Sequence, residues 1–150
     1  MPDPILPGAT LGILGGGQLG RMTAMAARSM GYDVHVLDPD PDGAARPLAS
    51  RVIVAAYDDA DAAAELARGV DAVTLEIEQI GRPALEAAAR HAPLRPGVEP
   101  VWLIQDRVRQ KEWLAAQRFP VGPFRRAEQA ADVVDAVGAF GASIVKSAHG

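Results

Sequence analysis

Three consecutive glycines at the end of an apolar run constrain this chain more than any other feature. The run Thr10–Leu14 is continuous and apolar, as a buried parallel strand should be. Gly15, Gly17 and Gly20 then follow with the spacing G-x-G-x-x-G. Residues without side chains let the backbone turn tightly and approach a phosphate, which then meets the amide-rich start of a helix. This spacing alone is a weak signal, so the rest of the chain has to decide which ligand it serves.

Strand-like and helix-like segments alternate through the first hundred residues, with short connections. Gln18–Met30 has apolar residues at near-helical spacing, and Gly31 follows it as a C-cap would. This alternation predicts an α/β fold, a doubly wound parallel sheet of Rossmann-like type, over residues 1–100. The expected strands are 10–14, 33–37, 51–55, 72–75 and 93–95, and the expected helices are 18–30, 44–49, a helix capped by Asp58 or Asp59 and ending at Ala67, and 83–91.

The composition changes near residue 100. Val101–Gln117 combines tryptophan and leucine with many charged residues, which predicts an amphipathic helix pair. A helix over Glu128–Phe140 and a new strand over Ser143–Lys146 are expected to follow. These elements cannot close a sheet on their own. Residues 101–150 are therefore expected to be linker helices and the first part of an incomplete second domain, cut at Gly150.

Charge and composition limit the classes of partner. The chain has 15 lysines and arginines against 19 acidic residues, a formal charge of −4, and no basic cluster, which argues against nucleic-acid binding. It has no cysteine, which is compatible with a reducing cytosol. No apolar segment approaches the ~18 residues of a membrane span, and Met1–Ala9 lacks the features of a targeting segment. We expect a soluble, cytoplasmic protein without nucleic-acid or membrane partners.

Acidic residues follow two of the expected strands. Asp38 lies about 20 residues after the glycines, where a dinucleotide-binding fold has its ribose-binding acid. It also opens an Asp-Pro-Asp-Pro-Asp-Gly turn, and aspartates favour turns for local reasons. Glu76 and Glu78 follow the strand expected at 72–75, on the same side if the strand alternation continues, where an acid can reach a ligand over the glycine loop. A dehydrogenase has no obvious need for this second pair.

Two cationic residues after residue 100, Arg107 and Lys146, can be explained either by ligand binding or by simple exposure at the surface. Asp106 can cap a helix and so place Arg107 in its first turn, where an anionic ligand would offset the unfavourable helix dipole. Lys146 ends the expected last strand, a good position for a phosphate contact. Taken alone, the helix that carries Arg107 fits a surface salt-bridge face equally well, and a lone lysine at a strand end is more often a plain surface residue. No Ser/His/Asp set and no metal-ligand spacing is visible, so no catalytic residue is predicted within these residues.

Taken in order, these motifs resemble the N-terminal part of the N5-carboxyaminoimidazole ribonucleotide synthetase family, within the ATP-grasp superfamily. The likeness covers essentially the whole chain. It is carried by Gly-Gly-Gly-Gln-Leu-Gly-Arg-Met at 15–22, Glu-Ile-Glu at 76–78, Gln-Asp-Arg at 105–107 with Lys111, and Ile-Val-Lys at 144–146. The resemblance implies a Rossmann-like pre-ATP-grasp domain that binds substrate, followed by the beginning of an ATP-grasp domain.

The resemblance also implies an activity, the ATP-dependent carboxylation of 5-aminoimidazole ribonucleotide with bicarbonate in purine biosynthesis, with release of ADP and phosphate. The glycine loop would hold the phosphate end of the ribonucleotide. The family's catalytic lid and Mg²⁺-binding acids would lie after Gly150, so the chain alone would be inactive, and the complete enzyme would be a homodimer. The implied substrate contacts are Gly17, Gln18, Leu19 and Glu76, and the implied ATP contacts are Arg107 and Lys146.

Some positions depart from the family pattern, and two alternatives stay open. Leu75, Ile77 and Gln79 stand where the family commonly has an aromatic residue, Phe and Asn. Formate-dependent phosphoribosylglycinamide formyltransferase, a related ATP-grasp enzyme, shares Glu-Ile-Glu but usually has Glu at the position of Gln18 and lacks the Gln-Asp-Arg helix. An NAD-binding Rossmann module, with Asp38 on the ribose, is the third possibility.

Overall fold

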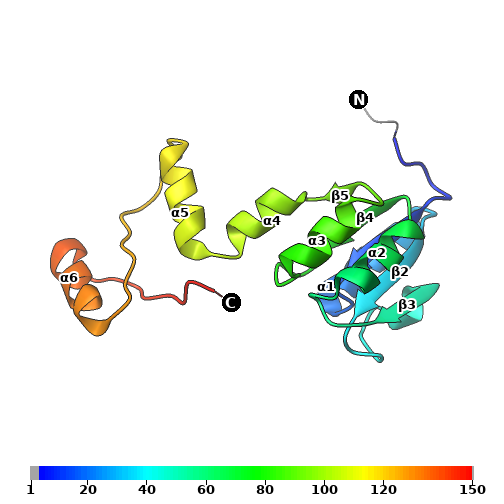
Figure 1. Ribbon diagram of the computed structural model, residues 1–150, viewed down its shortest axis with the longest axis horizontal. Helices are drawn as coiled ribbons and strands as arrows, with labels where there is room; N and C mark the ends of the chain where they lie inside the picture. The colour runs from blue at the N-terminus through cyan, green and yellow to red at the C-terminus, as the bar shows by residue number, and fades with distance from the viewer. Residues whose placement is uncertain (1–3, 150) are drawn as a thin grey trace. The chain divides into compact units, whose positions relative to one another are not determined.

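The first unit of the chain contains a five-stranded, all-parallel sheet. The computed structural model describes residues 4–149, and the chain divides into two compact units, Met1–Val101 and Trp102–Gly150 (Figure 1). The sheet has the order β3-β2-β1-β4-β5, and each neighbouring pair is parallel. The predicted α/β class and all five strands are confirmed. The strands are β1 (Thr10–Leu14), β2 (Asp33–Asp38), β3 (Arg51–Val54), β4 (Ala72–Leu75) and β5 (Leu94–Arg95).

Helices cover both faces of the sheet. The first unit contains α1 (Gln18–Ser29), the short 3₁₀ helix η1 (Arg46–Leu48), α2 (Ala60–Arg68) and α3 (Arg82–Ala89). One core cluster joins α1 to the face that carries Ile13, and the other joins α2 and α3 to the face that carries Leu14. Adjacent residues of β1 serve opposite faces because strand side chains alternate. This double covering explains why β1 is apolar throughout.

The winding direction of the sheet reverses at β1. From β1 the chain continues to β2 and β3 on one side, and later returns to place β4 and β5 on the other. In open α/β sheets, ligands bind beyond the carboxyl ends of the strands at such a switch point. Here that position lies between the ends of β1 and β4, where the glycine loop and Glu76 follow directly.

The second unit is largely helical. α4 (Val98–Ile104) runs across the division between the units, and α5 (Arg107–Ala116) and α6 (Ala130–Phe140) follow. The predicted helix pair is confirmed, with its break at Asp106, whose side chain caps α5. No residue of α5 is buried among the described residues, although its Trp113 ring stacks on Phe119 with the ring centroids 6.1 Å apart.

One expected element is absent from the described chain. Ser143–Lys146 forms no strand, and Ile144 and Val145 are 85% and 67% exposed. A strand needs a neighbour to pair with its backbone groups, and the described part of the second unit contains no other strand. The strand predicted here is therefore wrong for this structure. The predicted cut at Gly150 lies outside the described residues.

Candidate functional site

The glycine loop makes a turn that side chains would obstruct. Gly15 follows β1 with φ +104°, in the left-handed region that favours glycine. A Cβ atom at Gly20 would lie 2.4 Å from the Gly15 carbonyl oxygen. The first turn of α1 therefore packs directly on the loop, and two of the motif's three glycines are required by the geometry of the turn itself.

Asp38, at the end of β2, accepts a hydrogen bond from the glycine loop. Its side chain is buried, at 5% exposure, and its Oδ2 atom accepts hydrogen bonds from the Gly16 amide (2.5 Å) and the Tyr57 hydroxyl (2.8 Å). Its Oδ1 atom accepts from the Asp40 amide at 2.8 Å. With both oxygens engaged inside the protein, the carboxylate is not placed to bind a ribose. This arrangement removes the observation on which the NAD-binding alternative depended.

Glu76, directly after β4, accepts two further hydrogen bonds from the glycine loop. Its Oε1 atom accepts from the Gly17 amide at 3.1 Å, and its Oε2 atom accepts from the Gly20 amide at 2.9 Å. β4 ends at Leu75, so the strand alternation expected to place Glu78 beside Glu76 does not continue. Glu76 is thus brought to the glycine loop as predicted, but as a ligand of the loop's own amides.

These contacts change the expected role of the loop. The amides of Gly16, Gly17 and Gly20 all donate to carboxylates, which also offset the positive end of the α1 dipole. The phosphate end of a nucleotide would meet two negative charges and no open amide at these three positions. These contacts disfavour a phosphate at the three amides.

Two neighbouring positions remain accessible. Gln18 and Leu19 form the first turn of α1, where backbone amides have no acceptor within the helix. Both side chains are exposed, and Leu19 reaches 61%. Together with the half-buried Glu76, they present apolar, amide and carboxylate groups at the switch point, which can meet the neutral or donor-bearing part of a ligand.

Tyr57 is a member of this cluster that sequence reasoning missed. It lies in the connection between β3 and α2, and its hydroxyl donates to Asp38. Burial and the neighbouring Asp38 carboxylate raise the pKa of Tyr57 to about 12. The sequence does contain one indication of this role: Tyr57 lies shortly after a strand, and loops at the carboxyl ends of a parallel sheet converge.

The two predicted ATP contacts lie in the second unit. Asp106 accepts from the amides of Val108 (2.8 Å) and Arg109 (3.0 Å), which confirms the predicted cap and places Arg107 in the first turn of α5. The Arg107 amide donates to the Ala148 carbonyl at 2.9 Å. This bond brings α5 beside the segment that follows Lys146. Both cations are exposed, as a phosphate contact requires.

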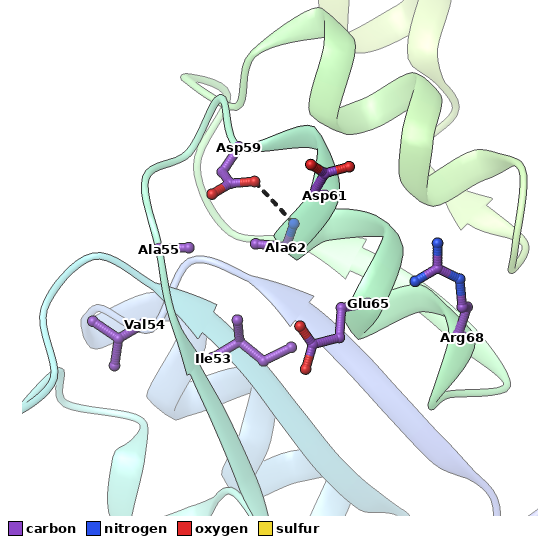
Figure 2. A pocket seen from close by; sticks show the side chains of 8 residues that line it. All are labelled: Ile53, Val54, Ala55, Asp59, Asp61, Ala62, Glu65 and Arg68. Atoms are coloured by element: carbon purple, nitrogen blue, oxygen red, sulfur yellow. Dashed lines mark hydrogen bonds between the residues drawn. The ribbon is translucent and has the colours of Figure 1, made fainter.

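A groove at the edge of the sheet, between β3 and α2, is a separate feature (Figure 2). Two of its three acidic side chains have partners, since Asp59 accepts from the Ala62 amide at 2.9 Å and Glu65 pairs with Arg51. None of the predicted site residues lies there. The groove lies beside the edge strand and away from the switch point.

Two kinds of feature are absent from the described residues. Within residues 4–149, no three histidine or acidic side chains come together in a way that could hold a metal ion. Over the same range, none of the helices combines the length and the apolar character needed to cross a membrane.

The fold and the site define a doubly wound α/β domain with a ligand position at the switch point between β1 and β4. The chain belongs to the ribonucleotide synthetase preATP-grasp domain family, whose model matches residues 8–105. N5-carboxyaminoimidazole ribonucleotide synthase of Brucella melitensis is 41% identical over 135 residues, which cover 90% of this chain and 37% of that protein. The chain thus spans little more than a third of this relative's length.

Solved structures give the same result. N5-carboxyaminoimidazole synthetase from Staphylococcus aureus, complexed with ADP, matches with a TM-score of 0.85 and 38% identity, covering 97% of this chain and 40% of that one. The Aspergillus clavatus enzyme, in complex with ADP and 5-aminoimidazole ribonucleotide, matches with a TM-score of 0.79 and 29% identity, covering 89% and 36%. The predicted family resemblance and the pre-ATP-grasp fold are confirmed.

Proposed function

We propose that this chain is the amino-terminal part of an ATP-dependent ligase that carboxylates 5-aminoimidazole ribonucleotide with bicarbonate to N5-carboxyaminoimidazole ribonucleotide. The observation that carries the proposal is the 41% identity to a named synthase over 90% of the chain. The enzyme would release ADP and phosphate and would serve purine biosynthesis. We further propose that the complete enzyme is a cytoplasmic homodimer.

The proposed reaction passes through an acyl phosphate. A bicarbonate oxygen attacks the γ-phosphorus of ATP, ADP leaves, and carboxyphosphate forms. The exocyclic amine of the substrate then takes the carbon, directly or as carbon dioxide, while phosphate leaves and the amine loses a proton. Because carboxyphosphate hydrolyses in water, the site has to exclude solvent. Phosphoryl transfer depends mainly on positioning and on cations around the transferring group.

The two units would have separate parts in this reaction. In the first, Gly17, Gln18, Leu19 and Glu76 would contact the ribonucleotide, with the Glu76 carboxylate accepting hydrogen bonds from its hydroxyl or amino groups. In the second, Arg107 and Lys146 would contact ATP phosphates. The enzyme would use Mg²⁺, but the described residues do not fit such an ion, since no suitable acidic cluster occurs among them. The metal ligands would therefore come from another part of the enzyme.

The activity assay needs a protein of the relatives' full length that carries this chain. Phosphate release would be measured while 5-aminoimidazole ribonucleotide is titrated in the presence of ATP, Mg²⁺ and bicarbonate. We expect release that depends on the ribonucleotide, and none from residues 1–150 alone. Release that ignores the ribonucleotide, or clear NAD binding without release, would contradict the proposal. Activity with formate and glycinamide ribonucleotide instead would favour the formyltransferase alternative.

The site assignment can be tested with Glu76→Ala. We expect the KM for the ribonucleotide to rise about 10- to 100-fold while the KM for ATP stays within a factor of about two, since the carboxylate lies at the ribonucleotide site alone. Glu65→Ala is the matched control, because Glu65 is an exposed glutamate of the same unit that pairs with Arg51 at the sheet edge. Equal loss of affinity for both substrates would show that Glu76 is assigned to the wrong site.

A further inference from the structure

Asp38 is an unusual residue for the interior of this domain. Among the described residues it is the only buried charged or polar side chain, yet the donors around its carboxylate are two backbone amides and a phenol hydroxyl. A buried carboxylate is costly unless its oxygens are fully hydrogen-bonded. Each of these three donors is therefore needed to keep Asp38 in place.

Tyr57 is the one side-chain donor of this set, and it connects several loops. Its hydroxyl reaches Asp38 Oδ2 (2.8 Å) at the end of β2, and its carbonyl accepts from the Gly81 amide (3.0 Å) ahead of α3. A Cβ at Gly81 would lie 2.8 Å from the Asp58 Cβ, so the two connections are in close contact. Tyr57 thus ties the β3–α2 connection to the loops that follow β2 and β4.

The path from Tyr57 to the first turn of α1 is short. The same Asp38 oxygen that accepts from Tyr57 accepts from the Gly16 amide, and Gly16 is followed by Gly17 and Gln18. The Gly16 carbonyl in turn accepts from the Ala45 amide at 2.8 Å. Gly16 is therefore held from both sides, and losing the Tyr57 hydroxyl would leave two backbone amides as the only described donors that hold the carboxylate against the loop.

The hydroxyl is also a dependable donor. Burial raises the pKa of Tyr57 to about 12, so the group keeps its proton throughout the neutral range. A donor that stays protonated at neutral pH suits a permanent positioning contact better than proton transfer, which favours a pKa near the working pH.

We propose that Tyr57 is a positioning residue of the ribonucleotide site: its hydroxyl holds the Asp38 carboxylate against the Gly16 amide and thereby orients Gln18 and Leu19 toward the substrate. This inference rests on the proposed function, which places the ribonucleotide at that turn. It adds a residue outside the glycine motif, without contact to the substrate, that sets ribonucleotide affinity.

The test compares Tyr57→Phe with Tyr32→Phe in the full-length enzyme. Tyr32 is the matched control because it is the only other tyrosine, lies in the same unit, and donates its hydroxyl to the Ile5 carbonyl (2.9 Å) at the opposite end of β2. We expect Tyr57→Phe to raise the KM for the ribonucleotide about 3- to 10-fold, with the KM for ATP and kcat within about twofold of wild type. Tyr32→Phe should leave all three unchanged.

The outcomes separate the two proposals. If wild-type enzyme releases no phosphate in response to the ribonucleotide, the proposed function is wrong, and the role of Tyr57 falls with it. If wild type responds but Tyr57→Phe has an unchanged ribonucleotide KM, or loses affinity for ATP equally, only the positioning role is wrong. Should Tyr57→Phe fail to fold, Asp38→Asn gives the same test, since an amide cannot accept from every donor that now surrounds the carboxylate.

Discussion

Gly20→Ala tests whether the close packing of α1 on the glycine loop is as tight as the structure shows. A second helical glycine provides the control, because Gly138 in α6 has nothing within 4 Å of a Cβ built on it. At Gly20 the same Cβ would lie 2.4 Å from the Gly15 carbonyl oxygen and 3.2 Å from its carbon. The two positions receive the same substitution in the same kind of secondary structure, and they differ sharply in the space available for a methyl group.

The expected effects have opposite signs. Glycine to alanine in a helix ordinarily stabilises by about 0.5–1 kcal/mol, because alanine loses less backbone entropy. At Gly20 the new methyl group meets backbone rather than a flexible side chain, so overpacking should cost about 1–3 kcal/mol. The shift would also strain the bond from the Gly20 amide to Glu76, which is 2.9 Å long and contributes about 1 kcal/mol. The net loss for Gly20→Ala is about 1–3 kcal/mol, against a small gain for Gly138→Ala.

Hydrogen exchange can locate both effects, since each helix lies in a different unit. Exchange of the β1 amides, followed by mass spectrometry with increasing urea, reports the opening free energy of the first unit. Gly20→Ala should lower this free energy and Gly138→Ala should leave it unchanged, while protection of α6 should rise only in Gly138→Ala. A Gly20→Ala protein whose β1 exchange matches wild type would refute the packing argument, because no room for a methyl group exists in the described arrangement.

Two further substitutions test local features of the first unit. Asp59→Ala removes the cap of α2, where the carboxylate accepts from the Ala62 amide at 2.9 Å. The substitution should lower the free energy of unfolding by about 1 kcal/mol, measured by urea denaturation at neutral pH. An unchanged free energy of unfolding would show that the cap does not stabilise the helix. His35 has a buried Nδ1 atom without a hydrogen-bond partner among the described residues, and burial lowers the pKa of this histidine below 6.5 although Asp33 opposes the shift. As the pH falls, the His35 imidazole therefore takes up a proton in the unfolded chain before it does so in the folded protein, and the free energy of unfolding should fall below about pH 6.5. His35→Leu should reduce that fall in denaturation curves measured at pH 7.5 and 5. An identical pH dependence in the variant would contradict the role given to His35.

Most helices and strands of the chain follow from local patterns. β1 was predictable because an unbroken apolar strand fits only a sheet that is covered on both faces, and the strand order shows that both neighbours of β1 are parallel. The helix starts were predictable from single residues such as Asp59 and Asp106, whose side chains accept from amides two or three positions ahead. The strand expected at 143–146 was wrong because pairing is not local, and apolar β-branched residues fix a strand only beside a neighbour.

The sequence does not reveal which groups accept hydrogen bonds from the amides of the glycine loop, for a similar reason. The spacing of the glycines specifies a tight turn and a row of amides, and both are present. It does not specify which acceptor fills those amides. That choice is made by Asp38, 22 residues from Gly16, and by Glu76, 59 and 56 residues from Gly17 and Gly20. The sequence places both acids after strands and suggests a ligand or a local turn as their partner, but not the amides of the glycine loop.

The same arrangement has a consequence for what the loop can bind. A glycine loop with open amides attracts a phosphate through the dipole of the following helix, whereas here two carboxylates already offset that dipole. A phosphate arriving at Gly17 would have to displace Glu76 and approach the buried charge of Asp38. A hydroxyl or amino group, by contrast, can donate to Glu76 while its bonds to the loop remain. The electrostatics of the loop thus favour the donor-bearing part of a ribonucleotide over its phosphate, which would need cations from another part of the enzyme.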